Sequence, residues 1–585
     1  MSAVNWLEWG DPAFARARAE DRPILLTIVA SWCRYCRDVD ATTFADPAVI
    51  QAVEEGYVPV RVDKDRRPDV NERYNAGGWP TIAFLTPEGE LLAGDTFLAS
   101  EEILPLLRRI APFYRENRDT IRARIADLVS RTLRAQERRE TSGGTLSPEI
   151  PRVVAGAILE HADPVYGGFG EGQKFLHPEA VDFALVWYGR TRDDRMREVL
   201  ERTLDSMAAG GIHDRLEGGF FRYATTRDWR QPNTEKLLES NAGPLRSFVE
   251  GWQVFEKEEY RRTAEGILRW LLATMRDPET GGFFGSQDAD PEYYSLPLEE
   301  RRRRVAPETD RTIYANWSAA TVSALLKTSV VLGSEEARAG ALRALEFLLA
   351  EMYDPSRGMH HYWDGTYHLA GLLTDQAYAM RMLVDAVQYT GENRYLAVAE
   401  RLARVLFEQQ ASPGGGFYDI RTEPGAIGGL KRRNRSILEN AVAAEALLRL
   451  SHFTRDETYR EAARRTLEAF TRDYKQYGYY VAGYARAVDL FFHEPLHLTV
   501  IGSRSDPATE ALRRAAFACY VPSRIVQVLD PEADADAFER AGLPRSERAT
   551  AYLTVGRTSY ASVTEPGELA SVMLMAERDR TAREA

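Results

Sequence analysis

Residues 31–36 have the sequence Ser-Trp-Cys-Arg-Tyr-Cys and directly follow the apolar run ILLTIVA at 24–30. A short, continuous apolar run rich in branched residues predicts a buried strand, and the residues after it predict a helix. Cys33 is therefore expected at a helix N-terminus, where free backbone N–H groups stabilise a thiolate. We expect Cys33 to be a nucleophile and Cys36, one turn further on, to resolve a mixed disulfide with a substrate.

Two other interpretations of this cysteine pair remain open. A zinc site needs two more Cys or His ligands, and none lies nearby in the sequence, so no metal and no cofactor are expected. The two cysteines can also be inert and buried. The chain holds only three cysteines, with Cys519 as the third, and this is no disulfide framework. A reducing cytoplasm is therefore the expected location.

Residues 1–112 predict a strand, a helix, a strand, a hairpin and a closing helix, which together make an α/β domain. Because Trp32-Cys33-Arg34-Tyr35-Cys36 follows a strand and Trp79-Pro80-Thr81 precedes one, this segment resembles the thioredoxin fold. The resemblance implies that Pro80 is cis, faces the cysteines and contacts a substrate backbone. Thioredoxins usually carry a buried acid six residues before the first cysteine. Here that residue is Thr27, so the handling of the Cys36 proton differs.

The rest of the chain contains a repeated sequence motif. Gly-Gly-Phe recurs at 167–169, 218–220, 281–283 and 415–417, each time after a stretch with helical periodicity. Six units of about 60 residues, each a helix pair with a Gly-aromatic loop, predict a closed (α/α)6 toroid over 149–489. An open α-solenoid is the alternative. Residues 113–148 predict a charged helix and a flexible linker, and residues 490–585 a small α/β subdomain.

The predicted toroid loops carry carboxylates, histidines and aromatic residues. Paired acids on facing loops are typical of glycoside hydrolysis, whereas a sugar epimerase uses histidines as acid and base. Aromatic rings there can stack on sugars or simply fill the toroid core, and an aspartate after glycine often only orders a turn. The histidine candidates are His177, His213, His360 and His361, and the aromatic ones are Tyr223, Tyr294, Trp317 and Trp363. The predicted substrate-binding set is Asp182, His213, Asp214, Glu235, Asp288, Asp290, Trp317 and Asp375.

These motifs occur in a familiar order. Nine motifs follow one another along the chain: an Asn-x-x-x-Trp opening at Asn5, the CxxC, Gly-Gly-Trp-Pro, GGFGEGQKFLHP, GGIHDRLEGGFFRY, TEKLLESNA, SQDAD, ANWSAA and LLTDQAY. Nearly end to end, the chain resembles the spermatogenesis-associated protein 20 family. The resemblance implies a thioredoxin-like domain joined to a toroid like those of glycosidases and N-acylglucosamine 2-epimerases. It implies no established reaction.

The sequence also departs from this family. Arg34 and Arg37 replace two histidines of the family's Cys-His-x-Cys-His pattern, and they still supply positive charge that favours a thiolate. Ser240 stands where the family has an acid. Thr554 and Ser559 replace a second cysteine pair, so the first pair is the only dithiol.

The composition of the chain argues against some classes of function, such as nucleic-acid binding and membrane-spanning proteins. The net charge of −13 argues against a nucleic-acid partner, which needs a basic face. No apolar run approaches the roughly 20 residues that span a membrane, and the N-terminus lacks the pattern of a signal peptide. Three hypotheses follow: a thiol–disulfide oxidoreductase whose toroid selects a protein substrate, a carbohydrate-active hydrolase or epimerase with a regulatory thioredoxin-like domain, and a non-catalytic scaffold.

Overall fold

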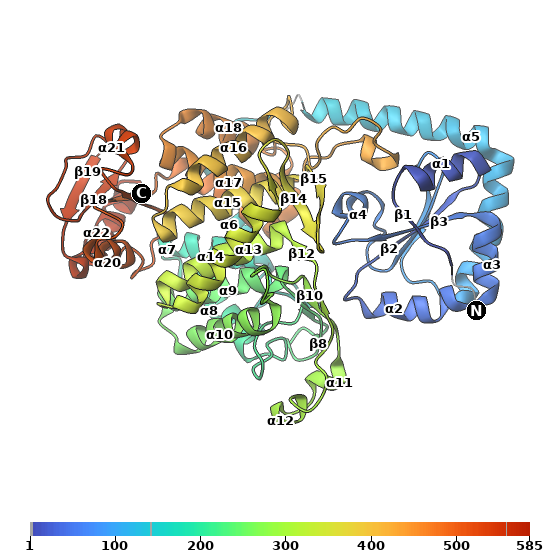
Figure 1. Cartoon of the computed structure of the whole chain (residues 1–585), viewed down its shortest axis with the longest axis horizontal. Coiled ribbons are helices and arrows are strands. Elements are labelled where there is room, and N and C mark those ends of the chain that lie inside the picture. The colour runs from blue at the N-terminus through green and yellow to red at the C-terminus, as the bar shows by residue number, and fades with distance from the viewer. Residues whose placement is uncertain (1–3, 141–142, 557, 585) are drawn as a thin grey trace. The chain divides into compact units, whose positions relative to one another are not determined.

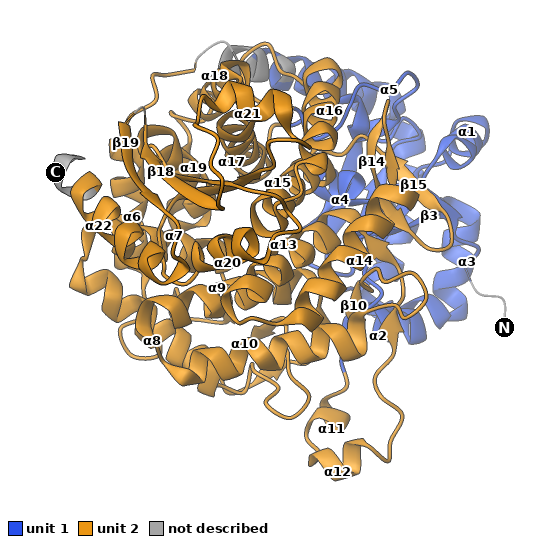
Figure 2. Cartoon of the chain, turned by 60° about the vertical axis from the view of Figure 1, so that its left-hand side comes forward, with its two compact units in different colours: residues 1–142, 287–289, 418–434 blue, residues 143–286, 290–417, 435–585 orange. Residues whose placement is uncertain are grey.

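The structure is a computed structural model and describes residues 4–140, 143–556 and 558–584. The chain forms two compact units (Figure 2). Unit 1 consists of residues 1–142, 287–289 and 418–434, and unit 2 of the remaining residues. The chain therefore leaves unit 1 and contributes to it twice more, through two short segments far along the sequence.

Unit 1 is built on a five-stranded sheet with the order β1-β3-β2-β4-β5. The first three strands in this order run parallel, and the last two are antiparallel to their neighbours. The central strand β2 is buried along almost its whole length, as expected for a strand covered on both faces. The strands are β1 (Leu7–Glu8), β2 (Ile24–Val29), β3 (Val58–Asp63), β4 (Thr81–Leu85) and β5 (Leu91–Asp95).

Alternate residues of β2 point into two separate cores. Leu25 packs with residues of α3 (Pro47–Gly56) and α5 (Ser100–Glu140), whereas Leu26 packs with residues of α1 (Asp11–Glu20) and α4 (Pro68–Tyr74). Helices thus cover both faces of the sheet (Figure 1). This arrangement confirms the predicted thioredoxin-like domain.

The closing helix and the charged helix predicted after this domain both lie within α5. Two helical stretches meet there at a kink at Asn117, whose torsion angles are non-helical. The predicted segment bounds at residues 112 and 148 stay predictions. Of the predicted linker, residues 141 and 142 lie outside the described residues.

The 418–434 segment of unit 1 lies against α4 and the turn between β4 and β5. The Tyr74 hydroxyl accepts a hydrogen bond from the Gly429 N–H and donates one to the Gly89 carbonyl, both at 2.6 Å. Gly89 has φ +87°, and a Cβ there would lie 2.6 Å from the Cα of Gly428. Only glycine allows this close approach of two backbones.

Unit 2 contains a closed ring of six helical hairpins. Each inner helix contacts the next inner helix, and α19 contacts both α6 and α7. This contact closes the ring, so the predicted toroid is confirmed and the open solenoid is wrong. The outer helices are α6 (Glu149–His161), α8 (Asp194–Ala209), α10 (Glu258–Trp270), α14 (Glu335–Glu351), α16 (Arg394–Gln409) and α18 (Glu457–Glu468). The inner helices are α7 (Pro178–Thr191), α9 (Glu239–Phe255), α13 (Ala315–Val331), α15 (Leu373–Thr390), α17 (Ile437–Thr454) and α19 (Ala482–Phe492).

Each Gly-Gly-Phe loop leads from an outer helix towards the next inner helix, and side-chain amides clamp several of these loops. The Asn241 side chain accepts a hydrogen bond from the Phe220 N–H and donates one to the Phe220 carbonyl. Asn440 makes the same pair with Phe417, and Gln376 makes it with Met359. An amide offers one acceptor and two donors, so a single side chain satisfies both backbone groups.

The C-terminal residues of unit 2 form a four-stranded sheet in the order β17-β16-β18-β19 with three helices (Figure 1). This is the small α/β arrangement predicted for the chain after residue 490. The predicted boundaries of the individual segments stay predictions. The strands are β16 (Leu496–Ile501), β17 (Arg524–Leu529), β18 (Thr550–Val555) and β19 (Thr558–Val563), and the helices are α20 (Pro507–Ala515), α21 (Ala535–Ala541) and α22 (Pro566–Glu584).

Candidate functional site

Cys33 lies at the front of the helix α2 (Arg34–Ala41), where it occupies the N-cap position with an extended backbone. Its Sγ accepts a hydrogen bond from the Cys36 N–H at 3.3 Å. The first N–H groups of a helix have no partner within the helix, and here one of them points at the sulfur. This contact stabilises the thiolate of Cys33 over its thiol.

The loop before β4 faces this sulfur. The Trp79–Pro80 peptide is cis, as the resemblance to thioredoxins implied, and Cys33 Sγ lies 3.6 Å from the Trp79 carbonyl oxygen. The cis peptide therefore places Pro80 beside the cysteine pair. A role for Pro80 in binding substrate stays a prediction.

The side chains of Cys33 and Cys36 are both buried. The hydrogen bond of Cys36 with Cys33, together with burial, raises the pKa of the Cys36 thiol far above its usual range. Cys36 therefore keeps its proton at neutral pH, as a resolving cysteine does before it attacks.

Two tryptophans flank the cysteine pair. The rings of Trp32 and Trp79 meet edge to face at 6.0 Å, and the Lys64 ammonium lies over both, 5.4 and 4.9 Å from their centroids. Lys64 also forms an ion pair with Asp65, which accepts a hydrogen bond from Trp32 Nε1 at 2.8 Å. These contacts fix both rings and keep a positive charge close to the site.

The two arginines that replace histidines have different surroundings. Arg34 is largely exposed and lies 3.9 Å from Asp38 on the same helix. Arg37 forms an ion pair with Asp288 at 2.7 Å. Asp288 was predicted among the toroid residues, but it belongs to unit 1. The Asp288 carboxylate balances the charge of Arg37, as Asp65 balances that of Lys64. Arg34 is therefore the least closely paired of these three cations.

Thr27 is fully buried, and its hydroxyl has no hydrogen-bond partner among the described residues. It cannot replace the carboxylate that thioredoxins carry at this position. Asp40 lies one helical turn after Cys36 on α2, and its charge raises the pKa of the Cys36 thiol, after the effects of Cys33 and of burial. Asp40 also binds Arg61, the residue opposite Thr27 on β3. The acid near Cys36 therefore comes from the helix rather than from the strand.

Some residues predicted to bind substrate in the toroid instead form contacts that stabilise its loops. Asp214 is buried and paired with Lys236 at 2.6 Å and Arg301 at 3.0 Å. Although burial opposes its charge, these cations hold the pKa of the Asp214 carboxyl below its usual value. Lys236 also donates to the Gly218 carbonyl, so the pair supports the Gly-Gly-Phe turn. In the first repeat Asp163 pairs with Lys174 in a similar way, but Lys174 donates to the Gly170 carbonyl, just after the Gly-Gly-Phe turn.

Other predicted residues lie apart from one another. Asp290 accepts a hydrogen bond from the Tyr293 N–H and caps a short helix. The His213 ring stacks on Phe220, and burial lowers the pKa of the His213 imidazole. Asp182 lies inside the ring, 3.0 Å from the Ser247 hydroxyl. Glu235 is buried in the loop before α9, and its carbonyl accepts a hydrogen bond from Arg222.

Three predicted residues do come together at the N-terminal ends of α13 and α15. Asp375 is fully buried, and both of its carboxylate oxygens lie 3.0 Å from His361 Nδ1. The His361 ring lies near Tyr314, whose ring packs on Trp317 at 4.6 Å. A carboxylate bonded to an imidazole sets its tautomer and raises its basicity. The cluster is therefore suited to proton transfer.

Three glutamates of the inner helices were missed by the sequence analysis. Glu179, Glu239 and Glu439 lie in the first turns of three inner helices, and the charges of all three raise the pKa of Tyr378 on α15. Burial is the larger cause and brings the pKa of Tyr378 to about 12. Glu179 is accessible to solvent, yet the surrounding protein desolvates it and raises the pKa of its carboxyl.

At the other end of the inner helices, a polar cavity of about 80 Å³ is covered by residues 520–525. Lys327 forms an ion pair with Glu250 there, and Arg449 pairs with Asp385 at 2.7 Å. Basic residues outnumber acidic ones among the side chains that line this cavity.

Residues 1–133 match the family model Thioredox_DsbH, described as "Protein of unknown function, DUF255". A thiol:disulfide interchange protein, DsbD 2 of Pseudomonas aeruginosa, is 34% identical over 83 residues, which are 14% of each chain. Spermatogenesis-associated protein 20 of Homo sapiens is 25% identical over 97% of this chain and 90% of its own. The chain has a relative in spermatogenesis-associated protein 20. The resemblance inferred from the motifs is thereby confirmed along almost the whole sequence.

Among solved structures, a sugar epimerase from a ruminal bacterium is similar to 58% of this chain and 86% of its own, with 12% identity and a TM-score of 0.47. The unsaturated glucuronyl hydrolase from Bacillus sp. GL1 is similar to 58% of this chain and 96% of its own, with 16% identity and a TM-score of 0.43. Along the described part of the chain, every helix is too short or too polar to cross a membrane.

Proposed function

We propose that the chain is a thiol–disulfide oxidoreductase that uses Cys33 as the nucleophile and Cys36 as the resolving cysteine. The observation that supports this most directly is the hydrogen bond from the Cys36 N–H to Cys33 Sγ at the start of α2. The cis peptide beside the pair and the raised pKa of the Cys36 thiol agree with it. The similarity of residues 1–133 to a thioredoxin-like family model points in the same direction.

The proposed reaction moves one disulfide bond from the substrate to the Cys33–Cys36 pair and then to an external dithiol, so electrons are conserved. The Cys33 thiolate attacks a substrate disulfide, forms a mixed disulfide and releases one substrate sulfur as a thiolate. Cys36 then loses its proton and attacks Cys33 Sγ, which forms the Cys33–Cys36 disulfide and releases the second substrate thiolate. The substrate disulfide is reduced and the cysteine pair is oxidised. An external dithiol restores the pair.

The second step needs a proton acceptor, and Asp40 is the acid that acts on Cys36 from the same helix. In our proposal Asp40 assists the loss of the Cys36 proton, and Arg61 positions its carboxylate. General base assistance is typically worth 10²–10⁴-fold in rate. Asp40→Asn should therefore slow resolution of the mixed disulfide by at least about tenfold and leave its formation unchanged.

Trapping the mixed disulfide on Cys33 tests the proposal. Cys36→Ser protein incubated with glutathione disulfide and, separately, with a peptide disulfide should accumulate a mixed disulfide on Cys33, seen as a defined mass increase. The matched control Cys519→Ser should turn over without accumulation. Equal labelling of Cys33 and Cys519 would contradict a specific nucleophile. Wild-type protein that never forms a Cys33–Cys36 disulfide would contradict the exchange itself.

A second candidate function is acid–base chemistry on a carbohydrate at the N-terminal ends of the inner helices. It rests on Glu179, which is accessible to solvent and whose carboxyl has a raised pKa, and on Glu239 and Glu439 in the first turns of two other inner helices. Glycoside hydrolysis uses one acid with a raised pKa together with a second carboxylate. Incubation with a panel of oligosaccharides should show turnover that Glu179→Gln abolishes and Cys33→Ser preserves. No turnover on any sugar would remove this candidate.

A further inference from the structure

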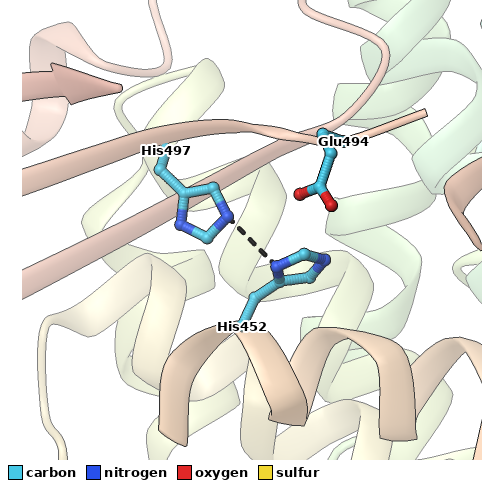
Figure 3. A group of neighbouring side chains, drawn as sticks. All are labelled: His452, Glu494 and His497. Carbon is cyan, nitrogen blue, oxygen red and sulfur yellow. Dashed lines mark hydrogen bonds between the residues drawn. The ribbon is translucent and has the colours of Figure 1, made fainter. Parts of the chain in front are cut away.

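Two histidines and a glutamate from three different elements of unit 2 converge at one point (Figure 3). His452 lies in the last turn of α17, and His497 is the second residue of β16. Glu494 lies in the short connection between α19 and β16, and its carbonyl accepts a hydrogen bond from Arg580. The site therefore joins the ring of helices to the C-terminal sheet.

The distances within this cluster are close to those of a metal site. His497 Nε2 and His452 Nδ1 lie 3.1 Å apart, and a Glu494 carboxylate oxygen lies within 4.8 Å of both. Two nitrogens bound tetrahedrally to Zn²⁺ at about 2.0–2.1 Å are about 3.3 Å apart. The imidazoles thus need almost no movement to share an ion. The exposed Glu494 side chain can close the remaining gap by changing rotamer.

The ring protons of the two histidines can be placed to suit coordination. His497 Nε2 and His452 Nδ1 hydrogen-bond to each other, so one of these two nitrogens carries a proton. Nε2 of His452 is buried and has no hydrogen-bond partner among the described residues, so it can carry the ring proton of His452 while Nδ1 binds an ion.

The donor atoms restrict the kind of metal. Arg460 and Arg449 lie near His452, and Arg455 lies near His497, so their positive charge opposes any dication. Mg²⁺ and Ca²⁺ bind mainly through oxygen ligands, of which this cluster offers one carboxylate. Zn²⁺ and similar ions form strong bonds to imidazole nitrogen and tolerate a single carboxylate.

We propose that His452, Glu494 and His497 form a binding site for Zn²⁺ or a similar transition metal, with the solvent-exposed position left to water. The ion would tie α17 to the start of β16. These three residues take no part in the proposed cysteine chemistry, so the inference does not depend on the proposed function.

Zinc binding is measured on untagged, full-length protein in which Cys33 and Cys36 are both serine, because a cysteine pair also binds zinc. Competition with a chromophoric chelator gives the affinity and stoichiometry. We expect one equivalent of Zn²⁺ to bind and to raise the melting temperature by a few degrees. His452→Asn and His497→Asn should each lose this equivalent.

Matched variants keep the test decisive. His493→Asn changes a neighbouring histidine that bonds to Asp489 and should bind zinc like its parent. Glu494→Gln alters an exposed side chain without disturbing the fold and should weaken binding by at least tenfold. Co²⁺ should give visible absorption bands that His497→Asn removes and His493→Asn retains. Absence of stoichiometric binding, or equal binding by the His452 and His493 variants, would overturn the proposal.

Discussion

The cysteine pair of unit 1 and the glutamates of the inner helices of unit 2 are assembled in different ways. The functional contact of Cys33 is to the N–H of Cys36, three residues away, so one strand end and one helix start create it. Glu179, Glu239 and Glu439 are distant in sequence and lie in the first turns of three inner helices of one closed ring. The difference teaches that a site made by local backbone geometry needs few elements, whereas the arrangement of these acids depends on several hairpins.

The largest effect is expected at Cys33. Cys33→Ser removes the nucleophile, so reduction of a disulfide substrate by the protein with excess dithiol should fall by at least about 10³-fold. Asp214→Asn, which changes unit 2 alone, should leave folded protein with unchanged disulfide turnover. The expectation is checked by measuring the rate of disulfide turnover by both variants and by the wild-type protein. Residual activity in Cys33→Ser would mean that the local geometry does not create the reactive group.

Asp214→Asn should instead act on the stability of the ring. It leaves the buried Lys236 ammonium without its carboxylate, and breaking a buried pair costs about 3–5 kcal/mol. Asp290→Asn is the comparison, since asparagine caps a helix about as well as aspartate, and it should cost less than about 0.5 kcal/mol. Denaturant unfolding measures both. Equal costs would contradict the structural role that we assign to Asp214.

The amide clamp should have an intermediate effect. Asn241→Ala leaves the buried Phe220 N–H and carbonyl without their partner, and each unsatisfied group costs about 1–3 kcal/mol. We expect a loss of about 3 kcal/mol in the free energy of unfolding. Asn393→Ala removes a hydrogen bond to the Val528 carbonyl and a long one from Gln527 at a partly exposed position, and it should cost about 1 kcal/mol. A smaller loss for Asn241 than for Asn393 would show that the clamps are not needed.

These examples also show what the sequence could predict. The CxxC helix, the cis proline and the repeat number follow from motifs whose parts lie close together or recur. The roles of Asp214, Asn241 and Asp288 could not be predicted. The partners of Asp214 and Asn241 are buried across a folded loop, and Asp288 pairs with Arg37, which lies 251 residues earlier in the chain. The acids at 179, 239 and 439 resembled ordinary first-turn glutamates, which favour a helix N-terminus anyway.

A pH experiment gives the smallest expected effect in unit 2. Burial, with a contribution from Lys174, lowers the pKa of His177 to about 4, whereas an unfolded histidine titrates near 6.5. The unfolded chain therefore binds more protons below about pH 6.5, and stability falls as the pH drops from 7 to 4. His177→Asn should flatten this dependence by about 2 kcal/mol, since asparagine tolerates the left-handed backbone at this position. Parallel curves for wild type and variant would contradict the assignment.

The most direct test of the account is the pH dependence of Cys33 alkylation by iodoacetamide, followed by mass spectrometry with Cys519 as the internal reference. The helix-start contact predicts that Cys33 reacts at pH 6 to 7, well below the pH at which the desolvated Cys519 thiol reacts. Substitution of Cys36 by alanine should keep this low midpoint, because the N–H of residue 36 remains. A Cys33 midpoint at or above 8.5, the value of an ordinary thiol, would contradict the account.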